Sequence, residues 1–182
     1  MMTYNRIETL NHSIAKAYPT FVKDLNLIIQ TNDNQLKTIP NYFTEVVALD
    51  LDDIQNEIAT QLKKNKDSSV DTCFVVSDEL RKRVILVEIK LNVENPNNYF
   101  NGNKSRRALC KKIEDSINLL GNALPIKNTY YLVFKPYSPQ GKPVLEIAKR
   151  LLFNISQELH QNYKAISIDE LKQTFFLEDK LS

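Results

Sequence analysis

Residues 84–91 read Val-Ile-Leu-Val-Glu-Ile-Lys-Leu, and this stretch decides the fold that the sequence predicts. Its β-branched and apolar residues are typical of a buried strand. Side chains alternate across a strand, so Glu88 and Lys90 share one face. The other face, which we expect to be the more completely buried one, carries Ile85, Val87, Ile89 and Leu91. Because an unpaired charge inside a buried strand is costly, Glu88 and Lys90 require a structural or functional reason.

A second strand-like run, Thr72–Val76, precedes this stretch and is joined to it by a polar turn. If the two runs form an antiparallel hairpin with its turn centred between Glu79 and Leu80, Asp71 lies opposite Glu88. Directly opposed side chains have Cβ atoms about 4.5–5.5 Å apart. Two carboxylates at that distance repel each other unless a cation lies between them. The sequence therefore predicts a site for Mg²⁺ (or Mn²⁺) at Asp71 and Glu88, because such cations prefer oxygen ligands.

Lys90 would point into the same site. A lysine there can orient an attacking water or stabilise the negative charge that develops on a phosphate group. Together with a divalent cation, these three side chains are the parts that phosphodiester hydrolysis requires. A solvated Glu88–Lys90 ion pair on an open sheet edge is the alternative interpretation of the same pattern.

Helical and strand-like segments alternate through the rest of the chain. Residues 51–62 carry an apolar stripe at helical spacing, and Asp50 can cap that helix. We expect further helices over residues 105–120 and from Pro143 onward, and further strands over residues 128–134 and 163–168. This alternation predicts an α/β protein in which helices pack against a sheet.

The amino-terminal part has a weaker pattern. Residues 6–30 are expected to be helical with a break at Tyr18-Pro19, since the residue before a proline avoids the helical conformation. Thr44–Leu49 fits a short strand or the start of a helix. We interpret the whole chain, residues 1–182, as one domain with a core over about 50–135, a helical amino-terminal extension and a carboxy-terminal helix–strand addition.

The bulk composition supports a globular protein. The chain has 182 residues, of which 42% are hydrophobic and 25% charged, so it can bury a core without disulfides or metals. No stretch approaches the roughly 18 apolar residues of a membrane span. The first residues lack a secretory signal, and the two cysteines, Cys73 and Cys110, fit no metal-ligand spacing. We therefore expect a cytoplasmic protein without a membrane partner.

Asp71, followed by Glu88-Ile89-Lys90 at the end of an apolar strand, resembles the PD-(D/E)xK nuclease superfamily. The resemblance implies a restriction endonuclease-like core, with a mixed central sheet flanked by helices in α-β-β-β-α-β order. It also implies that Asp71 and Glu88 are metal ligands, that Lys90 is the catalytic lysine, and that Glu57 is a further acidic ligand from the first core helix. The chain departs from the pattern at Val70, where the motif has proline. Its third core strand is either residues 44–49 or a short piece near residue 68.

Basic residues follow the Glu88-Ile89-Lys90 motif although the formal net charge is only +2. We predict that four of them bind the nucleic-acid backbone: Lys104, Arg106, Arg107 and Lys111. Tyr99 and Phe100 precede this cluster, where aromatic rings can stack on bases. Packing of the two rings against the core is the favoured alternative.

Two hypotheses of function follow. The first is a metal-dependent endonuclease that hydrolyses DNA in restriction, repair or defence, with a homodimer as a reasonable form for cutting both strands. The second is a catalytically inactive nuclease-like module, such as an immunity or antitoxin protein that binds a protein partner, or a DNA-binding subunit. Under the second hypothesis Asp71 and Glu88 bind no metal.

Overall fold

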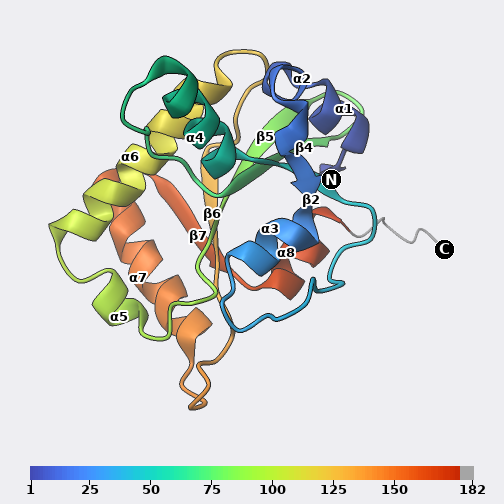
Figure 1. Cartoon of the computed structure of the whole chain (residues 1–182). Coiled ribbons are helices and arrows are strands. Elements are labelled where there is room, and N and C mark those ends of the chain that lie inside the picture. Colours follow the sequence, from blue (N-terminus) through green and yellow to red (C-terminus); the bar gives the residue numbers. More distant parts are fainter. Residues whose placement is uncertain (177–182) are drawn as a thin grey trace.

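Strand β5 (Lys82–Ile89) lies where the central sheet changes from antiparallel to parallel. The computed structural model describes residues 1–176 and shows an α/β fold with a mixed seven-stranded open sheet (Figure 1). Its strand order is β2-β3-β4-β5-β6-β7, and β1 pairs with the far end of β4. Strands β2 to β5 are antiparallel neighbours, whereas β6 and β7 run parallel to β5. In sheets of this kind, ligands bind beyond the carboxyl ends of the parallel strands.

The other strands are short. They are β1 (Thr3–Tyr4), β2 (Val22–Asp24), β3 (Val47–Asp50), β4 (Thr72–Ser77), β6 (Thr129–Val133) and β7 (Asn162–Ile166). The helices are α1 (Arg6–Asn11), α2 (Ser13–Ala17), α3 (Leu25–Thr31), α4 (Leu51–Leu62), α5 (Pro96–Tyr99), α6 (Asn103–Leu120), α7 (Val144–Leu159) and α8 (Ile168–Phe175), with a 3₁₀ turn over Pro19–Phe21. Over residues 1–176, no helix combines the length and the apolar character that crossing a membrane requires.

Helices cover both faces of the sheet (Figure 1). Leu86 and its neighbours on one face pack into a core with α4, α6 and α7. Val87 and its neighbours on the other face pack into a second core with α3 and α8. The face opposite Glu88 is the more completely buried one, as expected, but the difference is confined to Lys90, because Val84, Leu86 and Glu88 are buried as well. A charge on this strand must find its partners inside the protein.

Several local predictions are confirmed. The hairpin has the predicted register, with Thr72 opposite Val87 and Cys73 opposite Leu86. Asp50 caps α4 by accepting a hydrogen bond from the backbone N–H of Asp53 at 3.0 Å. Helix α6 ends at Gly121, whose φ of 62° is a conformation that glycine adopts without steric cost.

Two predictions about the order of elements are wrong. Residues 6–30 are not helical throughout, because Val22–Asp24 forms β2 and pairs with β3. The third antiparallel strand is Val47–Asp50, which agrees with the alternative over residues 44–49 and not with the one near residue 68, but it precedes α4 instead of following it. The predicted α-β-β-β-α-β order, with residues 51–62 as its first helix, is therefore not the order of this chain. Tertiary pairing decides both cases, since a three- or four-residue strand is stabilised by its neighbours rather than by its own sequence.

The central position of β5 makes a testable prediction about stability. Replacing the fully buried Leu86 by alanine removes packing in the larger core and should lower the free energy of unfolding by about 2–5 kcal/mol. Leu80→Ala is the control, because Leu80 is 91% exposed in the hairpin turn and should change the value by less than about 0.5 kcal/mol. Urea unfolding of both variants measures the difference, and equal midpoints would contradict the described core.

Candidate functional site

Asp71 and Glu88 meet on the face of the sheet that α4, α6 and α7 cover. Asp71 directly precedes β4 and Glu88 is the next-to-last residue of β5, so the hairpin register continues to this pair. The Asp71 carboxylate accepts a hydrogen bond from the backbone N–H of Ile89, the neighbour of Glu88. Both side chains are buried, and Glu88 is only 1% exposed. The fold thus places two acidic groups side by side within the protein, as the sequence predicts.

Two lysines neutralise Glu88 from different elements. Lys90, directly after β5, forms an ion pair with Glu88 Oε1. Lys112 reaches the same oxygen from α6, with its Nζ 2.6 Å away. Among the described residues, the second oxygen, Glu88 Oε2, is buried and has no hydrogen-bond partner. A buried carboxylate oxygen without a donor is costly, so it marks a position that a cation or a donor from outside the chain can fill.

Lys112 is a site residue that the sequence prediction missed. It belongs to the same basic cluster as Lys111, but it lies three residues after the buried Leu109 and four before the buried Ser116. Helical periodicity therefore turns Lys112 toward the sheet, and this spacing is the signal that identifies it.

Burial and charge shift the pKa values of the site. Burial and the nearby Glu88 carboxylate raise the pKa of Asp71 from its ordinary value of 3.8 to about 7. Burial alone would lower the pKa of Lys90, but the Glu88 and Asp71 carboxylates outweigh that effect and raise it. Lys90 is therefore charged at neutral pH, whereas Asp71 exchanges a proton near neutrality.

The residues present fit a magnesium ion that takes few protein ligands. Glu57 does not join the carboxylate pair: its Oε1 accepts a hydrogen bond from Gln61, and no group of three or more acidic, histidine or cysteine side chains within residues 1–176 is arranged to hold a metal. Mg²⁺ usually binds proteins through one or two carboxylates and keeps waters or substrate oxygens in its other positions. Asp71 and the free Oε2 of Glu88 fit that requirement.

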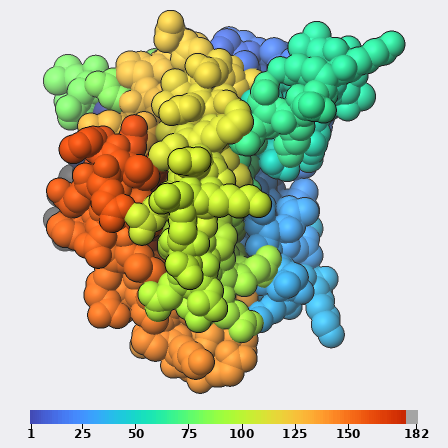
Figure 2. Space-filling view, turned by 90° about the vertical axis from the view of Figure 1, so that its left-hand side faces the viewer, coloured from blue at the N-terminus to red at the C-terminus, as the bar shows by residue number. Residues whose placement is uncertain are grey.

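The four residues predicted to bind nucleic acid lie in different surroundings. Arg106 pairs with Glu158 of α7, and Lys111 pairs with Asp115 at 2.6 Å. Together with Arg107, they line a shallow groove between α6 and the end of α7, while Lys104 is exposed in the first turn of α6. Figure 2 looks onto this side of the molecule, where α6 (yellow-green) runs beside α7 (orange). The structure brings none of these four residues into contact with Asp71, Glu88 or Lys90 by any ion pair or hydrogen bond that it describes.

The two aromatic residues before α6 have separate positions. Phe100 is buried and packs against Phe134, with ring centroids 6.3 Å apart, as the core-packing alternative predicts. Tyr99 is partly exposed, and its ring lies 5.7 Å from Lys90 Nζ. Tyr99 therefore lies next to Lys90 at the border of the site.

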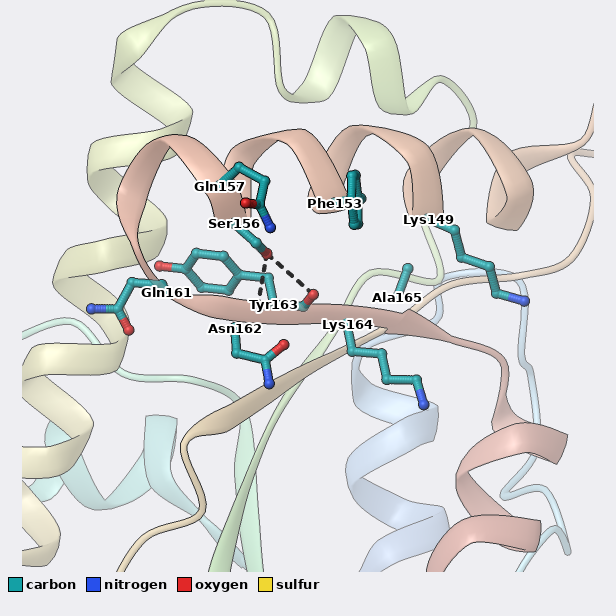
Figure 3. Close-up of a pocket in the computed structure, with 9 residues that line it drawn as sticks. All are labelled: Lys149, Phe153, Ser156, Gln157, Gln161, Asn162, Tyr163, Lys164 and Ala165. Atoms are coloured by element: carbon teal, nitrogen blue, oxygen red, sulfur yellow. Dashed lines mark hydrogen bonds between the residues drawn. The ribbon is translucent and has the colours of Figure 1, made fainter.

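Grooves described elsewhere on the surface are not lined by the carboxylates of Asp71 and Glu88. One is a groove between α7 and β7, lined by Lys149, Phe153 and Lys164 among others (Figure 3). In this groove Ser156 accepts a hydrogen bond from the backbone N–H of Tyr163 at 3.0 Å and donates one to its carbonyl oxygen at 3.3 Å. Its hydroxyl thus satisfies backbone groups at the edge of the sheet, which is a structural role.

No family model, curated protein or solved structure matches this chain. Inference about function therefore depends on the geometry of Asp71, Glu88, Lys90 and Lys112.

The raised pKa of Asp71 predicts how stability depends on pH. Between about pH 4 and pH 7 the folded protein keeps a proton on Asp71 that the unfolded chain has released. The free energy of unfolding should therefore fall as the pH rises through this window, by up to about 1.4 kcal/mol per pH unit from this group. Asp71→Asn should remove that contribution.

Urea unfolding at several pH values measures this effect in the absence of divalent cations. Glu57→Gln is the control, because its carboxylate is outside the site and its change should leave the slope of the wild type. Parallel pH profiles for the wild type and Asp71→Asn would contradict the assigned environment of Asp71.

Proposed function

We propose that this protein is a metal-dependent nuclease that hydrolyses phosphodiester bonds in DNA, of the restriction, repair or defence type. The observation that carries the proposal is the buried pair Asp71 and Glu88, with Lys90 beside it and with a Glu88 Oε2 that has no hydrogen-bond partner within residues 1–176. Buried like charges are rarely kept without a function, and strongly shifted pKa values gather at functional sites.

The topology around the pair supports a restriction endonuclease-like core. The β4–β5 hairpin is followed by α6 and then by β6, which runs parallel to β5. Asp71 and Glu88-Ile89-Lys90 stand at the matching ends of that hairpin. The position of α4 between β3 and β4 is the departure from the pattern.

Each residue has a separate role in the proposed reaction. Asp71 and Glu88 would hold Mg²⁺ or Mn²⁺, which when bound activates water and offsets charge on the phosphate. Lys90 would act as a hydrogen-bond donor to the attacking water or to a phosphate oxygen, since the Glu88 and Asp71 carboxylates favour its charged form. Lys104 and Arg107 are proposed to contact neighbouring backbone phosphates, because neither has an ion-pair partner among the described residues.

One observation favours the alternative, an inactive nuclease-like module that binds a protein partner or DNA. Two lysines already offset the charge of Glu88, so the site needs no metal to neutralise its carboxylates. A purely structural ion-pair network would have the same composition. Metal binding and cleavage separate the two functions.

The nuclease proposal predicts a metal-dependent activity that Lys90→Ala loses. The purified protein is incubated with plasmid or single-stranded DNA in the presence of Mg²⁺, Mn²⁺ or EDTA. Wild type should cut only with a divalent cation, and Lys90→Ala should be slower by about 10²–10³-fold, since one donor to the developing charge is removed.

Lys82→Ala is the matched control for this assay. Lys82 is at the opposite end of the same strand, where it pairs with Glu8, and its removal should leave the rate unchanged. If neither cation supports cutting and Mn²⁺ does not bind, the protein is a binding module and not a nuclease.

A further inference from the structure

The two lysines on Glu88 are held in different ways. Lys90 follows a central strand, and its backbone N–H donates to Val133 of β6 at 2.8 Å. Lys112 extends from α6 over the site, and its side chain is 29% exposed compared with 16% for Lys90. The flexible four-carbon stem of a lysine lets such an ammonium group move between partners. The Lys112 side chain is the more exposed of the two, and the Lys90 ammonium also lies 5.7 Å from the centroid of the Tyr99 ring, so Lys112 is the cation that leaves Glu88 more readily.

We propose that Lys112 is an exchangeable cation of this site. It neutralises Glu88 in the metal-free protein, and it moves to a nonbridging oxygen of the substrate phosphate when a divalent cation is bound. This inference rests on the proposed nuclease function and adds a residue that contacts the phosphate group undergoing reaction.

The distribution of partners on Glu88 supports the exchange. Both ammonium groups share Oε1, while Oε2 has no partner within the described part of the chain. Leaving one oxygen of a carboxylate that is 1% exposed without a donor costs free energy, so the ion pairs alone do not account for this arrangement. One open oxygen and one movable lysine are instead what a site needs in order to accept a cation without first losing its fold.

The charge of the site supports the same conclusion. Two lysines offset the charge of Glu88, and also that of Asp71 when Asp71 is ionised, so the metal-free site needs no cation in order to remain buried. A divalent cation adds two positive charges, and the repulsion between it and the nearby ammonium group favours release of Lys112 from Glu88. The released ammonium and the cation then face a phosphate whose negative charge grows during hydrolysis.

Metal affinity tests the exchange without any measurement of activity. Free Mn²⁺ is followed by electron paramagnetic resonance in titrations of wild type, Lys112→Ala and Lys112→Met, the last of which keeps most of the apolar stem. Removing the competing ammonium should tighten Mn²⁺ binding by at least about threefold in both variants. Lys149→Ala is the control: this lysine also bridges two carboxylates, Glu146 and Glu170, but at α7 and α8, and its loss should leave Mn²⁺ binding unchanged.

The salt dependence of DNA binding tests whether Lys112 contacts a phosphate group when a divalent cation is bound. In Ca²⁺, the slope of log affinity against log salt should be smaller by about one for Lys112→Ala than for wild type, because one phosphate contact is lost. In EDTA the two slopes should be equal, because Lys112 then remains on Glu88.

The outcomes separate this inference from the proposed function. Wild type that cuts DNA, together with Lys112 variants whose Mn²⁺ affinity is unchanged or weaker, overturns the exchange and leaves the nuclease in place. Failure of every protein to bind Mn²⁺ overturns both. The exchange is established if the Lys112 variants bind Mn²⁺ more tightly and if the slope of log affinity against log salt is smaller by about one for Lys112→Ala in Ca²⁺ but not in EDTA.

Discussion

The burial of the Glu88 carboxylate is the constraint on which the rest of this site depends. Glu88 lies on a strand that is covered on both faces and is 1% exposed, so its charge cannot be solvated by water. Two ammonium groups, from Lys90 and Lys112, reach its Oε1 from a strand end and from a helix. Helix α6 therefore covers this face of the sheet and also supplies one of the two positive charges that neutralise Glu88.

Strand β5 explains why the charges gather at this place. It is the last antiparallel and the first parallel strand of the sheet, so its carboxyl end adjoins both the start of β4 and the end of β6. Asp71 comes from the first of these neighbours, and the backbone of Val133 in the second holds Lys90. The two neighbours of β5 therefore bring a carboxylate and a backbone acceptor to the same end of this strand.

Particular residues show how far prediction from sequence reaches. The Asp71–Glu88 pairing was predictable because alternation and hairpin register are properties of a few adjacent residues. The role of Glu57 was not, since its place relative to the carboxylates depends on how α4 packs, and α4 presents Glu57 to Gln61. Strand β2 was missed for a similar reason: two of its three residues, Lys23 and Asp24, have little β-propensity, and they become part of a strand because β3 lies beside them.

Local periodicity and register were enough to predict the α/β class, the β4–β5 hairpin and the nearness of two carboxylates. The spacing of Lys112 from Leu109 and Ser116 turns Lys112, and not Lys111, toward the sheet. Its pairing with Glu88 Oε1, and the lack of a partner for Glu88 Oε2 within residues 1–176, follow only from the packing of α6 over β5. The physical reason is that a single residue step on a helix rotates a side chain by about 100°. Which of the two lysines enters the site is therefore set by how α6 packs against the sheet.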